Sequence, residues 1–273
     1  MRKLGVLSSG GDTPGMNAAV RAVVKTAAHY DLEVMGIRYG YKGLMAGDIF
    51  QLEPDDVRNI AHKGGTILKT ARSSEFMTPE GMQKALEMTD AYDLDGIVCI
   101  GGDGTMRGAA DLARNGVATI CLPGTIDNDL AYTDFTIGFD TAVNGVINEM
   151  IKVRDTMISH DRIGVVEVMG NKCGDIALYA GLASSCDYII VPEVEHDLDA
   201  MCKQLEKARL RGKKTCMIIV SEGAAKGEVI AEFVRDMTGF EVKSSVLGYT
   251  QRGGSPTAAD RILASRLGEA AVH

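Results

Sequence analysis

Two short stretches of glycine and aspartate hold the residues best suited to phosphate chemistry. IGGDGT spans Ile100–Thr105, and PGTIDND spans Pro123–Asp129. Glycines let a backbone come close to phosphate oxygens and point its N–H groups at them where a helix begins. A carboxylate in such a loop repels phosphate unless a cation lies between them, so Asp103 is predicted to bind Mg²⁺. A purely structural strand-to-helix turn is the alternative.

The second stretch places Asp127 and Asp129 two residues apart, which sets both carboxylates on one side of an extended backbone. One of them would accept the proton of a hydroxyl group that attacks a phosphoryl group, and the other would assist. Asp and Asn also favour turns, so an Asp-rich turn with local caps is the alternative.

Four arginines are candidates for binding phosphate: Arg72, Arg154, Arg162 and Arg252. A guanidinium fork matches phosphate oxygens, and Arg72 and Arg252 lie in polar loops that follow strand-like runs. For each arginine the alternative is an ordinary solvated surface side chain.

The composition narrows the class of protein. The chain has 273 residues, 45% of them hydrophobic, and a formal net charge of −8, which is typical of a soluble globular protein and argues against nucleic acid as the main partner. No apolar run reaches the length of about 18 residues that a membrane helix needs, and the N-terminus turns polar before a signal peptide forms. The six cysteines lack zinc-like spacing, and Cys99, Cys121 and Cys216 lie within strand-like runs. We therefore expect a cytoplasmic protein with reduced core cysteines.

Short, β-branched apolar runs alternate with helix-like stretches, the pattern of parallel sheets covered by helices. The predicted strands are Leu4–Ser9, Glu33–Ile37, Gly96–Ile100, Ala118–Leu122, Gly164–Val168, Tyr188–Val191, Cys216–Val220 and Val242–Leu247. The predicted helices are Met16–His29, Pro79–Tyr92, Thr105–Asn115, Thr141–Ile158, Gly174–Ala183, Leu198–Leu210, Glu228–Met237 and Thr257–Ala271. Glycine-rich turns follow many of these strands, and we expect them along the carboxyl edges of two sheets that meet near Gly138–Thr141.

These stretches, in this order and spacing, resemble the bacterial ATP-dependent 6-phosphofructokinase family along the whole chain. The resemblance rests on GVLSSGGDTPGMNAA, GGTILKTARSSEF, IGGDGT, PGTIDNDL, TDFTIGFDTA, VEVMGNKCGDIAL, SEGAAKG and LGYTQRGGSPTAADRILASRLG. It implies an α/β fold of two Rossmann-like three-layer domains, with mostly parallel sheets and the active site in the cleft between them. Residues 1–138 and 251–273 would form the larger, ATP-binding domain, and residues 139–250 the smaller domain, which binds the sugar phosphate. The family continues past His273, and the final RILASRLGEAAVH resembles an unfinished helix, so we expect a truncated chain.

The resemblance implies Mg²⁺- and ATP-dependent phosphorylation of fructose 6-phosphate at its 1-hydroxyl, the committed step of glycolysis. The ATP site would comprise Gly11, Tyr41, Arg72, Ser73, Gly102, Asp103, Gly104, Thr105 and Gly108, with Asp103 on the metal. Asp127 would be the catalytic base, helped by Asp129, Thr125 and Arg72. The sugar phosphate would meet Thr125, Asp127, Arg162, Met169, Gly170, Asn171, Glu222, Lys243, Tyr249 and Arg252. Arg162 and Lys243 would reach it from a neighbouring subunit of a homotetramer.

The same resemblance implies an effector site for ADP or phosphoenolpyruvate between subunits. Its residues would be Arg21, Lys25, Arg154, Asp187, Arg211 and Lys213, with Asp187 as a metal contact. The family has arginine at position 54, where this chain has Pro54, and a solvated turn is the alternative for residues 211–214.

Three sugar-site positions depart from the family pattern. The family has arginine at positions 171 and 243 and histidine at 249, where this chain has Asn171, Lys243 and Tyr249. Lysine lacks the bidentate fork, and asparagine and tyrosine lack a positive charge, so sugar-phosphate binding should be weaker or redirected to another sugar phosphate.

Gly104 and Gly124 favour ATP as the phosphoryl donor, because relatives that use pyrophosphate have aspartate and lysine at these positions. An aspartate at position 104 would repel the α-phosphate of a nucleotide. The alternative functions are a kinase of the same fold with a pyrophosphate donor or another sugar phosphate, and a non-catalytic regulatory subunit that binds nucleotide. The intact GGDGT and TIDND stretches disfavour the regulatory subunit.

Overall fold

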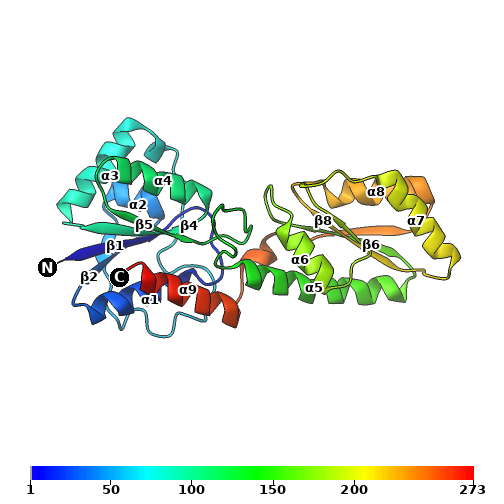
Figure 1. Ribbon diagram of the computed structural model, residues 1–273, viewed down its shortest axis with the longest axis horizontal. Coiled ribbons are helices and arrows are strands. Elements are labelled where there is room, and N and C mark those ends of the chain that lie inside the picture. Colours follow the sequence, from blue (N-terminus) through cyan, green and yellow to red (C-terminus); the bar gives the residue numbers. More distant parts are fainter. Residues whose placement is uncertain (1) are drawn as a thin grey trace. The chain divides into compact units, whose positions relative to one another are not determined.

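The computed structural model describes residues 2–273 and divides the chain into two compact units. Unit 1 comprises Met1–Thr125, Leu130–Thr141 and Arg252–His273, and unit 2 comprises Ile126–Asp129 and Ala142–Gln251. In each unit, helices cover both faces of a sheet (Figure 1). The predicted α/β class with mostly parallel sheets is confirmed.

Unit 1 contains a five-stranded sheet in the order β3-β2-β1-β4-β5, parallel except for the β2–β3 pair. Its strands are β1 (Lys3–Ser8), β2 (Glu33–Ile37), β3 (Ile49–Gln51), β4 (Gly96–Gly101) and β5 (Thr119–Pro123). Its helices are α1 (Met16–His29), α2 (Gly40–Ala46), α3 (Pro79–Ala91), α4 (Asp103–Arg114) and α9 (Ala258–Ala270), with a 3-10 turn η1 (Glu75–Met77). The sequence did not predict α2, β3 or η1: the first has glycine at two of its positions, and the others are only three residues long.

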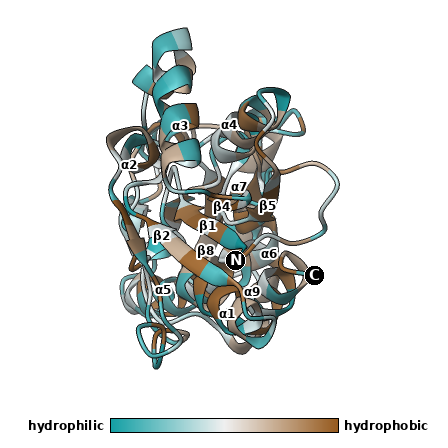
Figure 2. Cartoon of the chain, turned by 90° about the vertical axis from the view of Figure 1, so that its left-hand side faces the viewer, coloured by the Kyte–Doolittle hydropathy of each residue, from teal (hydrophilic) through white to brown (hydrophobic). Residues whose placement is uncertain are grey.

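The core of unit 1 lies on both faces of its sheet. Successive residues of β1 face opposite sides, so Val6 packs with α1 and α9, whereas Leu7 packs with α2, α3 and α4. All six residues of β4 are buried, and Figure 2 shows the hydrophobic colour along β1 and β4. A sheet covered on both faces leaves its loops for ligands.

Unit 2 contains a four-stranded parallel sheet in the order β7-β8-β6-β9. Its strands are β6 (Ile163–Val168), β7 (Tyr188–Ile190), β8 (Cys216–Ser221) and β9 (Val242–Val246). Its helices are α5 (Phe139–Ser159), whose first residues belong to unit 1, α6 (Asp175–Ala183), α7 (Leu198–Leu210) and α8 (Gly227–Thr238). The 3-10 turn η2 (Gly248–Arg252) follows β9.

All six cysteines are free thiols. Cys99, Cys121 and Cys216 lie in β4, β5 and β8, as predicted, and none of the six cysteines is in a disulfide. Burial raises the pKa of the Cys99 thiol to about 12, so this side chain acts as a core hydrophobe and not as a nucleophile. Across residues 2–273, no helix has both the length and the apolar composition needed to cross a bilayer.

Candidate functional site

The loops that follow β1 and β4 are fastened together at the carboxyl edge of the unit 1 sheet. The two strands pair in parallel, with Ser8 opposite Ile100. Beyond that pair, the Ser9 N–H donates to the Ile100 carbonyl at 3.1 Å, and Thr105 Oγ1 donates to the Ser9 carbonyl at 2.9 Å. The opening glycine loop and the IGGDGT stretch therefore form one surface.

Two glycines in these loops are required by close packing and backbone conformation. A Cβ on Gly101 would lie 2.3 Å from Thr105 Oγ1 and 2.5 Å from the Ser9 carbonyl oxygen. Gly10 has a φ of +84°, which favours glycine. Gly104 differs, because nothing lies within 4 Å of the position that its Cβ would take. The surface at residue 104 is therefore open.

Asp103 is the first residue of α4, and its carboxylate is exposed. It pairs with Arg107 through Nη2 at 2.7 Å and Nε at 3.2 Å. Among residues 2–273, no group of three or more His, Cys, Asp or Glu side chains is arranged to hold a metal ion. One exposed carboxylate beside helix N–H groups nevertheless fits magnesium, which proteins commonly hold through one or two carboxylates together with substrate phosphates.

Tyr41, predicted to line the ATP site, packs against α4 at Gly108, another predicted ATP-site residue. Tyr41 is buried, stacks on Phe76 with ring centroids 4.1 Å apart, and donates a hydrogen bond to the Thr105 carbonyl at 2.5 Å. A Cβ on Gly108 would lie 2.6 Å from the Tyr41 ring. Ser73 Oγ accepts the Phe76 N–H at 3.3 Å. Contact of these residues with a nucleotide stays a prediction, and the structure adds that the Tyr41 hydroxyl holds the first turn of α4 through Thr105.

Arg72 lies on a loop that is tied to the same surface. Thr70 Oγ1 donates to the Gly10 carbonyl at 2.8 Å. Asn17, buried in α1, holds residues 63–67 through both ends of its side-chain amide. The Arg72 side chain is exposed, and the part of the chain that the structure describes offers it no ion pair. Sequence reasoning missed Asn17 and Thr70, although both lie inside stretches that it singled out.

The stretch that carries the catalytic candidates begins beside the β4 loop. The Gly124 N–H donates to the Gly101 carbonyl at 2.9 Å. Thr125 Cβ lies 3.6 Å from the position that a Cβ on Gly102 would take. Asp127 follows, partly buried, in the short segment Ile126–Asp129 that belongs to unit 2.

Unit 2 brings Asp129 together with the turn predicted to bind the sugar. Asn171 has a φ of +54°, a conformation that asparagine tolerates. Its Nδ2 donates to Asp129 Oδ2 at 3.3 Å, and its N–H donates to Glu222 Oε1 at 3.1 Å. The buried Gln251 accepts the Met169 N–H at 3.1 Å. Sequence reasoning missed Gln251, which stands next to the predicted Arg252 in YTQRGGSP.

Arg162 and Lys243 lie at the amino ends of the strands of the unit 2 sheet, whereas the Met169–Asn171 turn lies at the carboxyl ends. Arg162 precedes β6, and Lys243 lies near the start of β9, opposite Gly164 of β6. Because β6 is six residues long, its two ends are about 20 Å apart at the usual rise of a parallel strand. Within unit 2, these two cations are therefore far from the Met169–Asn171 turn, which follows the other end of β6.

The last two sugar-site candidates lie in η2. Tyr249 is 78% exposed. Arg252 lies against the opening loop of unit 1, with its Nη2 2.6 Å from Asp12 Oδ1. A Cβ on Gly11 would be 2.9 Å from the same nitrogen, so the guanidinium packs on bare backbone. Gly11 thus makes room for an arginine, and its contact with ATP stays a prediction.

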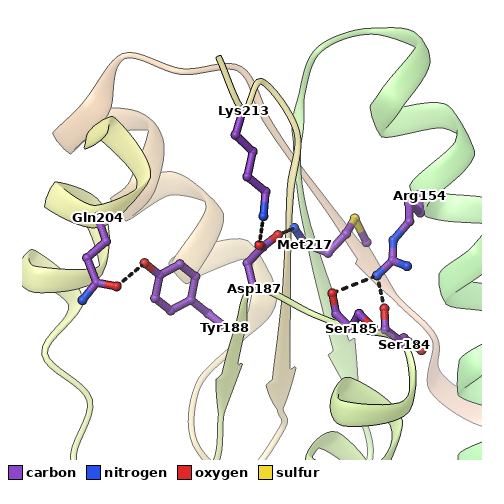
Figure 3. Close-up of polar contacts among 8 residues, drawn as sticks. All are labelled: Arg154, Ser184, Ser185, Asp187, Tyr188, Gln204, Lys213 and Met217. Carbon is purple, nitrogen blue, oxygen red and sulfur yellow. Dashed lines mark hydrogen bonds and ion pairs between the residues drawn. The ribbon is translucent and has the colours of Figure 1, made fainter. Parts of the chain in front are cut away.

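Two of the predicted effector residues of unit 2 form an ion pair. Lys213 pairs with one oxygen of Asp187, and the other oxygen accepts the Met217 N–H at 2.8 Å (Figure 3). The hydrogen bond to Asp187 raises the pKa of Lys213 above its ordinary value. Lys213 therefore stays protonated and carries its own counter-ion.

The remaining effector candidates are spread over three helix segments. Arg154, on α5, donates to the Ser184 carbonyl (Figure 3). Arg211 is exposed just after α7. Arg21 and Lys25 stand one turn apart on α1 of unit 1. Their meeting at one ligand stays a prediction.

The chain is similar to known proteins along its whole length. Residues 3–273 match the family described as Phosphofructokinase. The chain is 52% identical over 273 residues to an ATP-dependent 6-phosphofructokinase of Clostridium botulinum and 55% identical to one of Clostridium tetani, covering 100% of this chain and 86% of each relative. A solved phosphofructokinase from Saccharomyces cerevisiae superposes with a TM-score of 0.93 at 36% identity, covering 100% of this chain and 41% of that one.

Proposed function

Because this chain belongs to the phosphofructokinase family, we propose that it transfers the γ-phosphoryl group of ATP to the 1-hydroxyl of fructose 6-phosphate. The observation that carries this proposal is the meeting of three loops at one sheet edge. Thr105 bonds to the Ser9 carbonyl there, and the Gly124 N–H bonds to the Gly101 carbonyl. Bare backbone, a carboxylate suited to a metal and the start of the acidic TIDND stretch thus lie together, as phosphoryl transfer requires.

The nucleotide half of the reaction depends mainly on backbone groups. The N-terminus of α4 follows Gly101 and Gly102, and no side chain caps it, so the N–H groups of Asp103 and Gly104 and the positive end of the dipole would serve phosphate oxygens. Arg72 would add a forked cation to the transferring group. Asp103 would hold Mg²⁺, which neutralises phosphate charge when bound.

Asp127 would be the catalytic base. The 1-hydroxyl oxygen forms a bond to the γ-phosphorus, the bond from that phosphorus to the β–γ bridging oxygen breaks, and ADP leaves with the electron pair. The hydroxyl proton passes to the Asp127 carboxylate, which is a modest base but suffices where the transition state is loose. Thr125 would orient the hydroxyl group, and Asp129, held by Asn171, would assist.

The sugar phosphate would bind with groups from two subunits. The cations Arg162 and Lys243 lie about 20 Å from the Met169–Asn171 turn along β6. Unit 2 of one chain is therefore unable to deliver both groups to one sugar, and a neighbouring chain must supply the cations. This separation supports sites shared between subunits, as in the homotetramer that the family resemblance implies.

Regulation and location complete the proposal. Phosphate-bearing effectors, ADP or phosphoenolpyruvate, would bind the cationic residues Arg21, Lys25, Arg154, Arg211 and Lys213, with Asp187 as a metal contact. The protein would act in the cytoplasm, where its six unpaired cysteines would stay reduced.

The test is a matrix of donors and acceptors. ATP and pyrophosphate are each combined with fructose 6-phosphate and with other sugar phosphates, and product formation is measured. ATP with fructose 6-phosphate should give the highest kcat/KM. Three results would each contradict the proposal: turnover with pyrophosphate but not with ATP, preference for another sugar phosphate, and nucleotide binding without turnover.

A substitution tests the base. Asp127→Ser should lower kcat by about 10²–10⁴-fold, the usual contribution of a general base, with little change in ATP affinity. Asp236→Ser, at an exposed position of α8, is the control and should keep kcat. Full turnover by Asp127→Ser would show that another group takes the proton.

A further inference from the structure

Three charged residues gather where β6 and β9 begin. The Ile163 N–H donates to the Glu241 carbonyl at 3.0 Å, and Gly164 pairs with Lys243. This register sets Arg162 and Glu241 side by side, with Lys243 two residues further along. All of them lie in unit 2, so the cluster is fixed by strand pairing within one sheet.

One carboxylate oxygen serves both cations. Arg162 Nη2 lies 2.7 Å from Glu241 Oε1, and Lys243 Nζ lies 3.8 Å from the same oxygen. Arg162 lowers the pKa of Glu241, with smaller contributions from Lys243 and His160, so Glu241 is ionised at neutral pH. The free protein therefore neutralises part of the charge that the sugar phosphate needs.

Glu241 uses only part of the guanidinium fork. Arg162 Nε is buried and has no hydrogen-bond partner within residues 2–273. A phosphate monoester carries three oxygens, so once the displacement of Glu241 exposes Nε it can take Nε and Nη2 together and still contact the Lys243 ammonium. Such an ion satisfies more donors than the single Glu241 oxygen does.

Glu241 is also held less firmly than the buried carboxylate of unit 2, Glu167. The Glu241 side chain is 54% exposed. Glu167, which pairs with Lys226, is 7% exposed, and its second oxygen accepts the Gly227 N–H at 2.7 Å. Glu167 is thus fixed by a helix terminus, whereas Glu241 is held only by ion pairs in which its own carboxylate stays half-exposed, so that water screens them.

We propose that Glu241 is a resident counter-ion that occupies the phosphate-binding face of Arg162 and Lys243 and is displaced when the 6-phosphate of the sugar binds. This rests on the proposed function, which assigns the two cations to that phosphate. Glu241 weakens the affinity of the cluster for the phosphate ester. It also excludes anions that are unable to bind Nε and Nη2 of Arg162 together, because such anions do not displace it. It touches no reacting atom and acts only through the two cations.

Glu241→Gln keeps the shape of the side chain and removes its charge. In steady-state assays of the full chain, the KM for fructose 6-phosphate should fall about two- to fivefold, the range expected on removal of one partly exposed competing charge. The kcat and the KM for ATP should not change. Glu149→Gln removes the partner of Lys152 on α5 and is the matched control, with no change in any of the three constants. An unchanged or raised KM for fructose 6-phosphate in Glu241→Gln would overturn the proposal.

A second measurement does not need turnover. Inorganic phosphate is titrated calorimetrically into the wild type, Glu241→Gln and Arg162→Ala, and the heat lost in Arg162→Ala identifies binding at this cluster. That binding should be tighter in Glu241→Gln by a similar factor, and equal affinity would overturn the proposal. If the wild type fails to phosphorylate fructose 6-phosphate, the proposed function is wrong, while this titration still decides whether Glu241 competes with phosphate.

Discussion

The two units use charge in opposite ways at the sheet edges that carry their candidate residues. In unit 1, the loops after β1, β4 and β5 meet at one edge, joined by bonds to backbone carbonyls such as that of Ser9. Arg72 is exposed there and lacks an ion pair within residues 2–273. In unit 2, the candidates are divided between two edges, and Arg162 and Lys243 share the carboxylate of Glu241.

This difference separates two kinds of phosphate recognition. Backbone N–H groups at a helix N-terminus are fixed by the fold, so a nucleotide site built from them is complete within one unit. The cationic side chains Arg162 and Lys243 share a counter-ion in the free protein, and under the proposed function they would serve another chain. Under that proposal, the nucleotide half would be a property of one fold unit, whereas the sugar half would depend on assembly and on competing carboxylates.

The largest effect should come from mixing two defective chains. Asp127→Ser removes the base and Arg162→Ala removes a cation, so each alone should lower kcat/KM by about 100-fold or more. If Arg162 serves a neighbouring chain, hybrids made by unfolding and refolding the two variants together contain some sites with both groups intact. Activity should then rise about tenfold or more above that of either parent.

The control for this experiment is a second mixture. Here the Arg162→Ala chain is mixed with the Lys243→Ala chain. Both substitutions affect the cations that one chain would donate to its neighbour, so no site regains the complete pair. This hybrid should stay as defective as its parents. No recovery in the first mixture would show that each chain completes its own sugar site and would remove the contrast between the units. Recovery in the second mixture would show that Arg162 and Lys243 of one site come from different chains.

Charge placed on the bare nucleotide edge should have the next largest effect. Gly104→Asp puts a carboxylate where nothing lies within 4 Å, so folding should be unaffected while ATP phosphates are repelled. The KM for ATP should rise about 10- to 100-fold, with the KM for fructose 6-phosphate unchanged. Gly104→Ala adds bulk without charge and should change the KM for ATP much less. Equal effects of the two variants would mean that space, and not charge, limits this edge.

The parts that the sequence predicts well are those set by local pattern. Buried strands such as β4 and the helix starts after glycines follow from apolar runs and turn residues. The pairings Arg162–Glu241 and Arg252–Asp12 were not predicted, because they depend on strand register and on contacts between residues up to 240 positions apart. Asn17 and Gln251 were missed for the same reason: their amides act on distant backbone groups that no local pattern reveals.

Buried carboxylates extend the comparison between the units. In unit 1, Asp260 is 1% exposed and accepts N–H groups of Gly138 at 2.9 Å and Thr141 at 2.8 Å. It thereby holds the start of α5 without a cation, unlike Glu167 of unit 2, which pairs with Lys226. Asp260→Asn exchanges one acceptor oxygen for a donor and should lower the free energy of unfolding by about 1–3 kcal/mol. Glu269→Gln, exposed on the same helix, is the control in a denaturant titration and should have no effect.

The loss of stability in Asp260→Asn should change with pH in one direction. Burial raises the pKa of Asp260, although the hydrogen bonds from Thr141 and Gly138 lower it in part. A folded-state pKa above the unfolded value gives stability that is present below the unfolded value and is lost as pH rises through the folded one. The difference in unfolding free energy between the wild type and Asp260→Asn should therefore grow as pH falls from neutrality toward about 4. A difference that shrinks on acidification would mean that Asp260 is held chiefly by its hydrogen bonds.

The smallest effect concerns the neutral amide at the carboxyl edge of unit 2. Asn171 donates to Asp129 at 3.3 Å and adds no charge to a site meant for an anionic sugar. Asn171→Arg should strengthen sugar-phosphate binding by about 1 kcal/mol for one charge-assisted hydrogen bond, a fall of about fivefold in the KM for fructose 6-phosphate. Asn171→Gly keeps the positive φ and removes the amide, so it separates the loss of the Asp129 contact from the gain of charge. Asn171→Arg could leave this KM unchanged while Glu241→Gln lowers it. Phosphate affinity would then be set only by the residues at the amino ends of the strands of unit 2, and the residues at the carboxyl ends would serve catalysis.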